Sequence, residues 1–191
     1  MSSGTLAFMH EFARQPMAVG AVAPSGSALT RQVTAPVPAS GHPVVVELGP
    51  GTGAFTGAIQ TRLAGRGQHV AVDVNERFTS LLAERYPRLD VVTADARDLA
   101  SVIDRRADVV ISGLPWAAFR QQQQREILDA VTGILTPDGA FTTFAYVHAR
   151  WTPPARRFHR ELTERFEEVV LGRTVWANVP PALVYHCRRP R

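Results

Sequence analysis

The chain contains no lysine, so all 21 of its basic residues are arginines. We interpret this bias as the mark of a GC-rich genome rather than a special need for guanidinium groups. The single cysteine, Cys187, excludes an internal disulfide and fits an inert buried thiol in a reducing cytosol. No apolar run approaches the ~20 residues of a transmembrane helix, and the N-terminus has no secretion-signal pattern. We therefore expect a cytoplasmic protein, either free or peripheral at the inner membrane surface.

Charge is unevenly distributed along the sequence. Residues 150–191 hold nine arginines against four acidic residues, a net charge of +5, whereas the rest holds 12 against 13, a net charge of −1. A basic C-terminal part can attract phosphate groups of nucleic acid or of an anionic membrane, or it can be a solvated face. The length of 191 residues suits one domain with a substantial core.

Short β-branched runs alternate with helical segments along most of the chain. Strands are predicted at 43–48, 68–74, 89–94, 107–112 and 140–147. Helices are predicted at 55–64, 76–86 and 119–135. This alternation indicates an α/β fold with parallel strands joined by right-handed crossovers. After a helix near 155–164, strands at 166–179 and 182–188 are separated by only two prolines, so we expect the last strand to run antiparallel.

The first forty residues have a different character. Residues 5–15 separate on a helical wheel into an apolar face, which includes Phe8 and Phe12, and a polar face. Such a helix is either a packed cap or one that lies on a membrane or covers a site. We therefore divide the chain into an N-terminal helical segment with potential membrane contact, residues 1–40, and a main domain, residues 41–191.

The stretch VVVELGPGTGAF, residues 44–55, joins a strand to a helix through a glycine-rich turn. Glycines let a backbone approach a ligand closely, and ligands bind beyond the carboxyl ends of parallel strands. Two patterns fit the loop: the dinucleotide pattern G-x-G-x-x-G/A from Gly49, and acid-x-G-x-G-x-G from Glu47. A carboxylate at Glu47 would repel a pyrophosphate but would suit a ligand with an ammonium group, so the second pattern is favoured.

Two further acids follow neighbouring predicted strands. Asp73 ends the second strand and can accept hydrogen bonds from both hydroxyls of a ribose. Asp95 follows the third strand, where it can accept from the amino group of adenine. These acids could also be unrelated surface residues, but all three, with Glu47, lie at predicted strand ends. Together they describe S-adenosylmethionine, which combines an amino acid, a ribose and an adenine.

On these residues the sequence resembles class I S-adenosylmethionine-dependent methyltransferases over residues 40–188. The resemblance implies a Rossmann-like seven-stranded sheet, mostly parallel with an antiparallel last strand. It implies that the glycines pack against the methionine part of the cofactor and that Ala96 joins Asp95 at the adenine. The implied cofactor-binding residues are Glu47, Gly49, Gly51, Gly53, Asp73, Val74, Asp95, Ala96 and Ser112.

The methyl acceptor is usually met after the fourth strand, here ISGLPW at 111–116. This stretch resembles the N-L-P-aromatic box of ribosomal RNA adenine dimethyltransferases, in which the asparagine carbonyl binds the target amino group. Gly113 stands at the asparagine position, however, and keeps only a backbone carbonyl. Nucleic acid is therefore the less favoured partner.

A second resemblance, to bacterial phospholipid N-methyltransferases, spans nearly the whole chain. It is carried by the segments 19–29, 45–56, 112–116, 144–147 and 178–186. It implies conversion of phosphatidylethanolamine towards phosphatidylcholine, a carboxylate contact at Ser25, and an N-terminal helix that binds the membrane and closes over the site. Methyl transfer from a sulfonium needs no metal, but the amine must first lose a proton. Tyr146, with His148 as a second candidate, is predicted to orient the amine or relay that proton.

The sequence thus predicts a lipid or small-molecule amine as substrate and contact with an anionic membrane. Methylation of a small molecule or of ribosomal RNA adenine is the alternative enzymatic hypothesis. A cofactor-binding module that regulates a partner protein is the non-enzymatic one, because no unambiguous general base is visible in the sequence.

Overall fold

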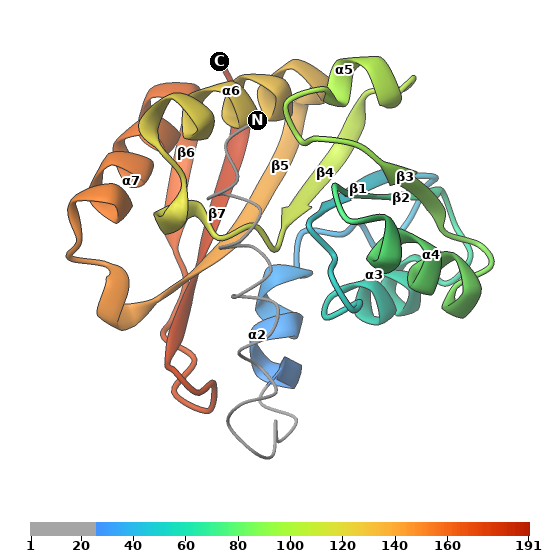
Figure 1. Ribbon diagram of the computed structural model, residues 1–191, viewed down its shortest axis with the longest axis horizontal. Coiled ribbons are helices and arrows are strands. Elements are labelled where there is room, and N and C mark those ends of the chain that lie inside the picture. Colours follow the sequence, from blue (N-terminus) through green and yellow to red (C-terminus); the bar gives the residue numbers. More distant parts are fainter. Residues whose placement is uncertain (1–25) are drawn as a thin grey trace.

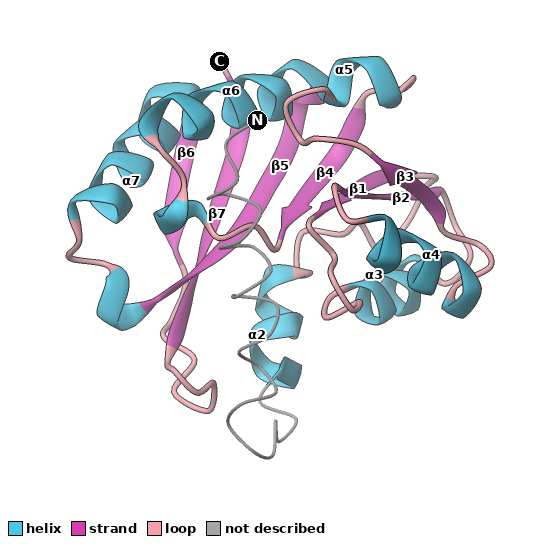
Figure 2. Cartoon of the chain, in the orientation of Figure 1, coloured by secondary structure: helices cyan, strands magenta, loops and turns pink. Residues whose placement is uncertain are grey.

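Seven strands form one twisted sheet, and helices cover both of its faces (Figure 1, Figure 2). The computed structural model describes residues 26–191. The strand order is β3-β2-β1-β4-β5-β7-β6. The strands are β1 (Val44–Leu48), β2 (Gln68–Asp73), β3 (Asp90–Thr93), β4 (Ala107–Ser112), β5 (Leu135–Tyr146), β6 (Phe166–Leu171) and β7 (Ala182–Pro190).

The first five strands run parallel to one another, whereas β7 runs antiparallel to both of its neighbours, β5 and β6. This arrangement confirms the Rossmann-like seven-stranded sheet with an antiparallel last strand. The helices are α2 (Gly26–Val33), α3 (Thr56–Leu63), α4 (Glu76–Arg85), α5 (Leu99–Val102), α6 (Gln121–Ile134) and α7 (Pro153–Arg165), with short 3-10 helices η2 (Trp116–Ala118) and η3 (Val147–Ala149).

The core lies on both faces of the sheet, which explains why the central strands are continuously apolar. Val110 of β4 packs with residues of α5, α6 and α7, while its neighbours Val109 and Ile111 pack with residues of α2 and α3. Successive strand residues point to opposite faces. On β1, the same alternation places Glu47 with Val45 on the face that α2 and α3 cover.

Helix α2 was not predicted from the sequence, because it is short and is followed by a proline-rich stretch. Its Leu29 and Val33 are buried with Val37 against the sheet. The Thr142 hydroxyl of β5 also donates a hydrogen bond to the Val33 carbonyl (2.8 Å). Part of the predicted N-terminal segment 1–40 therefore packs into the core of the main domain. The predicted helix at 5–15 and Ser25 lie outside the described residues.

The strand predicted at 166–179 is wrong in its second half, because β6 ends at Leu171. Residues 172–181 form a folded loop instead. Within it, Val175 is buried and bridges to Ala182, and the buried Asn178 donates from Nδ2 to the Pro180 carbonyl (2.6 Å). These local hydrogen bonds take the place of a continuous sheet ladder in residues 172–179.

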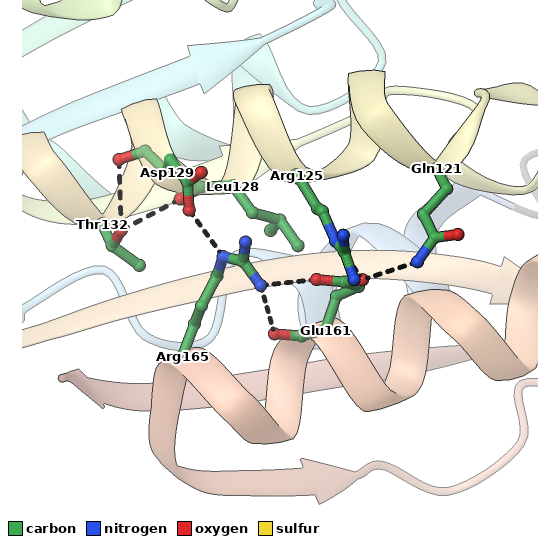
Figure 3. A network of polar contacts seen from close by, with 7 residues as sticks. All are labelled: Gln121, Arg125, Leu128, Asp129, Thr132, Glu161 and Arg165. Carbon is green, nitrogen blue, oxygen red and sulfur yellow. Dashed lines mark hydrogen bonds and ion pairs between the residues drawn. The ribbon is translucent and has the colours of Figure 1, made fainter.

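Helices α6 and α7 are joined by a polar network around Glu161 (Figure 3). Its Oε1 accepts from Arg125 Nε (2.7 Å), and its Oε2 accepts from Arg165 Nη1 (2.6 Å). Arg165 also donates to Asp129 (2.8 Å). Burial raises the pKa of Glu161, but the hydrogen bonds from both arginines outweigh this effect and bring the pKa below its usual value.

None of the helices in residues 26–191 has the length and apolar character needed to span a membrane.

Candidate functional site

The glycine loop lies between β1 and α3, and its three alternate glycines all have positive φ. A Cβ on Gly49 would come within 2.7 Å of Leu114 Cδ2. For Gly51 (φ +56°), the described residues place no atom within 4 Å of such a Cβ. The positive φ of Gly49 (+62°) and the close Leu114 side chain therefore both favour glycine at this position. At position 51 the loop backbone is open, so it can be approached by a ligand.

Glu47 lies beneath this loop and is completely buried. Its Oε2 accepts a hydrogen bond from the Thr56 hydroxyl at the start of α3 (2.7 Å) and lies 3.2 Å from His69 Nε2 on β2. His69 Nδ1 is 2.9 Å from the Gln60 amide nitrogen, and its Nε2 is buried without a hydrogen-bond partner among residues 26–191. Within residues 26–191, Glu47 Oε1 is buried without a hydrogen-bond partner.

Asp73, at the carboxyl end of β2, holds the glycine loop from the side. Its Oδ2 accepts from the Gly51 amide (3.2 Å), and its Oδ1 accepts from the Asn75 amide (2.9 Å). Burial raises the pKa of Asp73 above its ordinary value despite these hydrogen bonds. Each carboxylate oxygen has a further acceptor position, and the next residue, Val74, is partly exposed. The predicted contact between Asp73 and a ribose remains a prediction.

Asp95 is not joined to the glycine loop by any hydrogen bond found in the described residues. Instead, Arg97 holds it with two side-chain hydrogen bonds, Nε to Oδ1 (3.0 Å) and Nη2 to Oδ2 (2.8 Å). These bonds hold the pKa of Asp95 below its usual value. Arg97 also lies 3.5 Å from Glu126 on α6. An adenine amino group would therefore have to share Asp95 with Arg97 or displace it.

Ala96 and Ser112 both lie in buried positions. Ala96 packs into the core cluster beside α5 and α6. The Ser112 hydroxyl accepts from the Leu114 amide (3.2 Å) and from Trp116 Nε1 (3.1 Å), so it shapes the turn after β4. Trp116 itself stacks on Phe158 with ring centroids 4.6 Å apart and is a core residue.

Gly113 packs directly against the glycine loop. Its amide donates to the Leu48 carbonyl (2.8 Å), and a Cβ on Gly113 would lie 2.7 Å from the Gly49 carbonyl oxygen. Real Cβ atoms almost never approach backbone so closely. A side chain at this position would therefore displace the loop, which gives the glycine a structural reason.

A row of aromatic rings runs from the glycine loop to the end of β5. Phe55 contacts Phe144 edge to face (5.9 Å between centroids), Phe144 contacts Tyr146 (5.6 Å), and Tyr146 stacks on His148 (5.7 Å). Tyr146 is half-buried, and burial raises its pKa. At neutral pH its hydroxyl therefore stays protonated and can donate and accept hydrogen bonds, but it is a poor base.

The structure therefore brings Glu47, Asp73 and the loop glycines into one connected group, with Tyr146 joined to it through aromatic contacts. Sequence reasoning missed Thr56 and His69, which fix Glu47. The available signal was a histidine beside the apolar run of the strand QHVAVD.

Comparisons with known proteins decide the family. A family described as a methyltransferase domain matches residues 45–139. The ornithine lipid N-methyltransferase of Singulisphaera acidiphila is 35% identical over 191 residues, which covers 95% of this chain and 94% of that protein. The chain belongs to the class I S-adenosylmethionine-dependent methyltransferases. It is close to the bacterial lipid N-methyltransferases within that class.

Solved structures support the fold of this methyltransferase. The N-methyltransferase NodS from Bradyrhizobium japonicum WM9 has a TM-score of 0.71 at 18% identity, covering 89% of this chain and 99% of that chain. The same protein in complex with S-adenosyl-L-homocysteine has a TM-score of 0.67 at 18% identity, covering 89% and 90% of the two chains. S-adenosylmethionine is the methyl donor of this methyltransferase.

The residues present fit this donor. A buried carboxyl oxygen without a partner costs free energy, about 1–3 kcal/mol, and an ammonium group would supply the hydrogen bond that Glu47 Oε1 lacks. The open backbone at Gly51 leaves room for the methionine part, and Asp73 lies beside it. When bound, the donor supplies an electrophilic methyl group. The assignment of individual residues to parts of the donor remains a prediction.

Proposed function

We propose that this methyltransferase transfers methyl groups to the primary amine of a membrane lipid. The observation that carries the proposal is the 35% identity to an ornithine lipid N-methyltransferase over nearly the full length of both chains. Ornithine lipids and phosphatidylethanolamine both present a primary amine beside acyl chains. We take phosphatidylethanolamine, methylated towards phosphatidylcholine, and ornithine lipid as the two candidate acceptors.

Tyr146, at the end of β5, is the residue that we propose orients the lipid amine. A primary ammonium group has a pKa of about 10 and must lose its proton before it can attack a methyl group. The neutral Tyr146 hydroxyl can accept from the amine and orient its lone pair, but its raised pKa makes it unsuitable as the base. His148 is exposed and stacks on Tyr146, which supports it as the group that passes the proton to solvent. Alignment of amine and methyl group supplies much of the rate.

Methylation of an RNA adenine finds less support. The glycine at position 113 offers no side-chain carbonyl for a base, and the 2.7 Å approach to Gly49 leaves no room for an asparagine there. The ribosomal RNA hypothesis would then depend on backbone groups alone.

The test uses the full-length protein, radiolabelled S-adenosylmethionine and mixed micelles that contain either phosphatidylethanolamine or ornithine lipid. We expect labelled lipid in one or both reactions after extraction and chromatography. Donor binding is measured in parallel by calorimetry. Bound donor without any labelled lipid rejects the proposal. Label in stripped ribosomal RNA instead would favour the adenine hypothesis, and binding without turnover on a panel of amines would favour a regulatory module.

A further inference from the structure

Two of the three tryptophans in this chain are exposed to solvent. Trp151 is 73% exposed and Trp176 is 74% exposed, whereas Trp116 is buried at 3%. Val179, three residues after Trp176, is 84% exposed. Tryptophan side chains bury large areas in cores and interfaces and are enriched at the boundary between a membrane and water. Such exposure of two tryptophans indicates a surface that has a partner.

The two tryptophans belong to segments that lie side by side. Trp151 follows η3, directly after β5, and Trp176 lies in the loop between β6 and β7. The segments are tied together by the Val147 amide, which donates to the Pro181 carbonyl (2.9 Å), and by the pairing of Tyr146 with Ala182. Figure 1 shows η3 and the β6–β7 loop at the same end of the sheet, where β5 ends. This is also the end at which Tyr146 lies.

The loop that carries Trp176 and Val179 is stabilised by its own hydrogen bonds and buried side chains. Asn178 is buried, and it donates from its amide nitrogen to the Val175 carbonyl (3.2 Å) and from Nδ2 to the Pro180 carbonyl (2.6 Å). Val175 is buried as well. Polar and apolar anchors thus point inward, while the largest apolar side chains of the loop point outward. The exposure of these side chains is a consequence of how the loop is built.

The charge around the tryptophans is positive. No acidic residue occurs between Asp138 and Glu161 or after Glu168. Arg150 and Arg173 are exposed, and neither forms an ion pair within the described part of the chain. The Arg150 guanidinium lies 5.2 Å from the centroid of the Trp151 ring. The partner must therefore accept apolar side chains and carry negative charge.

We infer that Trp151, Trp176, Val179, Arg150 and Arg173 form a docking surface for an anionic lipid bilayer. Tryptophan rings and a valine insert at the headgroup level, and the arginines contact lipid phosphates. Nucleic acid would use the arginines but would gain little from an exposed valine. The inference rests on the proposed function for its purpose, because docking at this end brings Tyr146 to the surface that holds the lipid amine.

The first test is cosedimentation of the full-length protein with vesicles of phosphatidylcholine and phosphatidylglycerol. We expect the double variant Trp151→Ala/Trp176→Ala to bind these vesicles at least tenfold more weakly than the wild type. Leu81→Ala on α4 is the matched control, because Leu81 is 44% exposed on a helix of the opposite half of the sheet, and it should bind as the wild type. Unchanged affinity for the donor verifies that each variant folds. Wild-type vesicle binding by the double variant overturns the inference.

The N-terminal segment provides a second comparison. Phe8→Ser/Phe12→Ser tests the helix predicted there with the same vesicles. If only this variant loses binding and the tryptophan variant keeps it, the docking surface is wrong. If the tryptophan variant loses binding, the docking surface is supported whatever the N-terminal variant does.

Fluorescence identifies which side chains enter the bilayer. The variant Trp176→Phe leaves Trp151 as its only exposed tryptophan, and Trp151→Phe leaves Trp176, with Trp116 buried in both. We expect brominated lipids to quench both variants, and the absence of quenching in both contradicts docking through the rings. The double variant Arg150→Gln/Arg173→Gln should bind neutral vesicles as tightly as the wild type. The ratio of its affinity for anionic vesicles to its affinity for neutral ones should be severalfold lower. An unchanged preference refutes the role of the arginines.

Docking and methylation are separated by the form of the lipid. On short-chain lipid dispersed in detergent, the tryptophan variant should retain wild-type methylation, and on vesicles it should lose at least tenfold. Equal activity of both proteins on vesicles overturns the docking surface while the proposed function stands. Binding to vesicles that contain phosphatidylethanolamine or ornithine lipid, without any methylated lipid, rejects the proposed function while the docking surface stands.

Discussion

Two buried glutamates lie on opposite faces of the sheet and have different surroundings. Glu161, between α6 and α7, is 2% exposed and has both oxygens paired with arginines (Figure 3). Glu47, beneath the glycine loop, is 0% exposed, and within residues 26–191 its Oε1 has no partner. Both carboxyl oxygens of Glu161 are hydrogen-bonded without a ligand, whereas within the described residues only one oxygen of Glu47 is. A buried carboxylate is therefore informative about function only when its hydrogen bonds are counted.

The comparison predicts that the two acids respond oppositely to removal. Loss of one member of a buried ion pair is strongly destabilising, by about 3–5 kcal/mol, because the partner charge remains. Loss of an incompletely satisfied carboxylate relieves a cost in the absence of ligand. Glu161 should thus matter for unfolding, and Glu47 for binding.

The largest expected effect is that of Glu161→Ala on stability. We expect the free energy of unfolding to fall by about 3 kcal/mol, at the low end of the range above, because Arg165 keeps Asp129 and Arg125 is half-exposed. Chemical denaturation measures this change, and donor affinity should stay within about twofold. Glu164→Ala, an exposed change on the same helix, is the control and should alter stability by less than ~0.5 kcal/mol.

The same acid should shape the response to pH. The folded-state pKa of Glu161 is depressed, so its contribution is present above the unfolded pKa and is lost as pH falls through the folded pKa. Wild-type and Glu161→Ala stabilities should therefore converge on acidification below about pH 4, the region of the unfolded pKa. A difference that stays constant to the lowest accessible pH would contradict the ion-pair account.

The complementary change is Glu47→Gln, which keeps the shape of the side chain. We expect donor affinity to weaken by about 1–3 kcal/mol, the scale of a lost charged hydrogen bond. Stability without ligand should change by less than ~1 kcal/mol, because an amide carbonyl can still accept from Thr56. Calorimetry and denaturation measure the two quantities on the same preparation. A large loss of stability with normal donor affinity would mean that Glu47 has a structural role like that of Glu161, and would contradict the proposed difference between the two acids.

Asp73→Ala addresses the other acid of the glycine loop. We expect donor binding to weaken by roughly 1–3 kcal/mol, because the predicted ribose acceptor and the hydrogen bond to the Gly51 amide are both removed. Calorimetric titration of donor into the variant measures the loss. Unchanged affinity would mean that the ribose assignment is wrong.

Sequence patterns predicted the parts of this fold that depend on local composition. The five parallel strands were visible because each is a short apolar run, and the antiparallel β7 followed from the lack of room for a crossover helix. The end of β6 was missed because Asn178 and Val175 form contacts that only the folded loop reveals. Helix α2 was missed because its stability comes from packing on β5 and β7 rather than from its own sequence.

In the candidate site, too, the residues that follow from a local sequence pattern were predictable, whereas the contacts between strands were not. Glu47, Asp73 and the glycines follow from a strand-loop-helix pattern, and the structure places them together. The contact of Glu47 with His69 depends on the register between β1 and β2, in which Val45 faces His69. That register is a tertiary property, so no spacing along the chain could have indicated it.

Tyr146→Phe tests whether the row of aromatic rings ends in a functional hydroxyl. We expect kcat to fall about tenfold, equivalent to ~1.4 kcal/mol of activation free energy, while donor affinity and stability remain unchanged. Steady-state kinetics with the accepted lipid measure kcat and KM separately. A fall in stability with normal kcat would instead make Tyr146 a packing residue.

The smallest expected effect concerns Arg97. It donates hydrogen bonds to Asp95, as Arg125 and Arg165 do to Glu161, but this pair lies at the surface. The two side chains are 47% and 31% exposed, and exposed ion pairs contribute about 0.2–1 kcal/mol. If Asp95 accepts from adenine, Arg97→Ala should leave stability within that range and tighten donor binding severalfold, because the carboxylate no longer has to be shared. Arg77→Ala, an exposed arginine on α4, is the control. Calorimetry that finds identical affinity in both variants would separate Asp95 from the adenine, and would leave Glu47 and Asp73 as the only acids of the donor site.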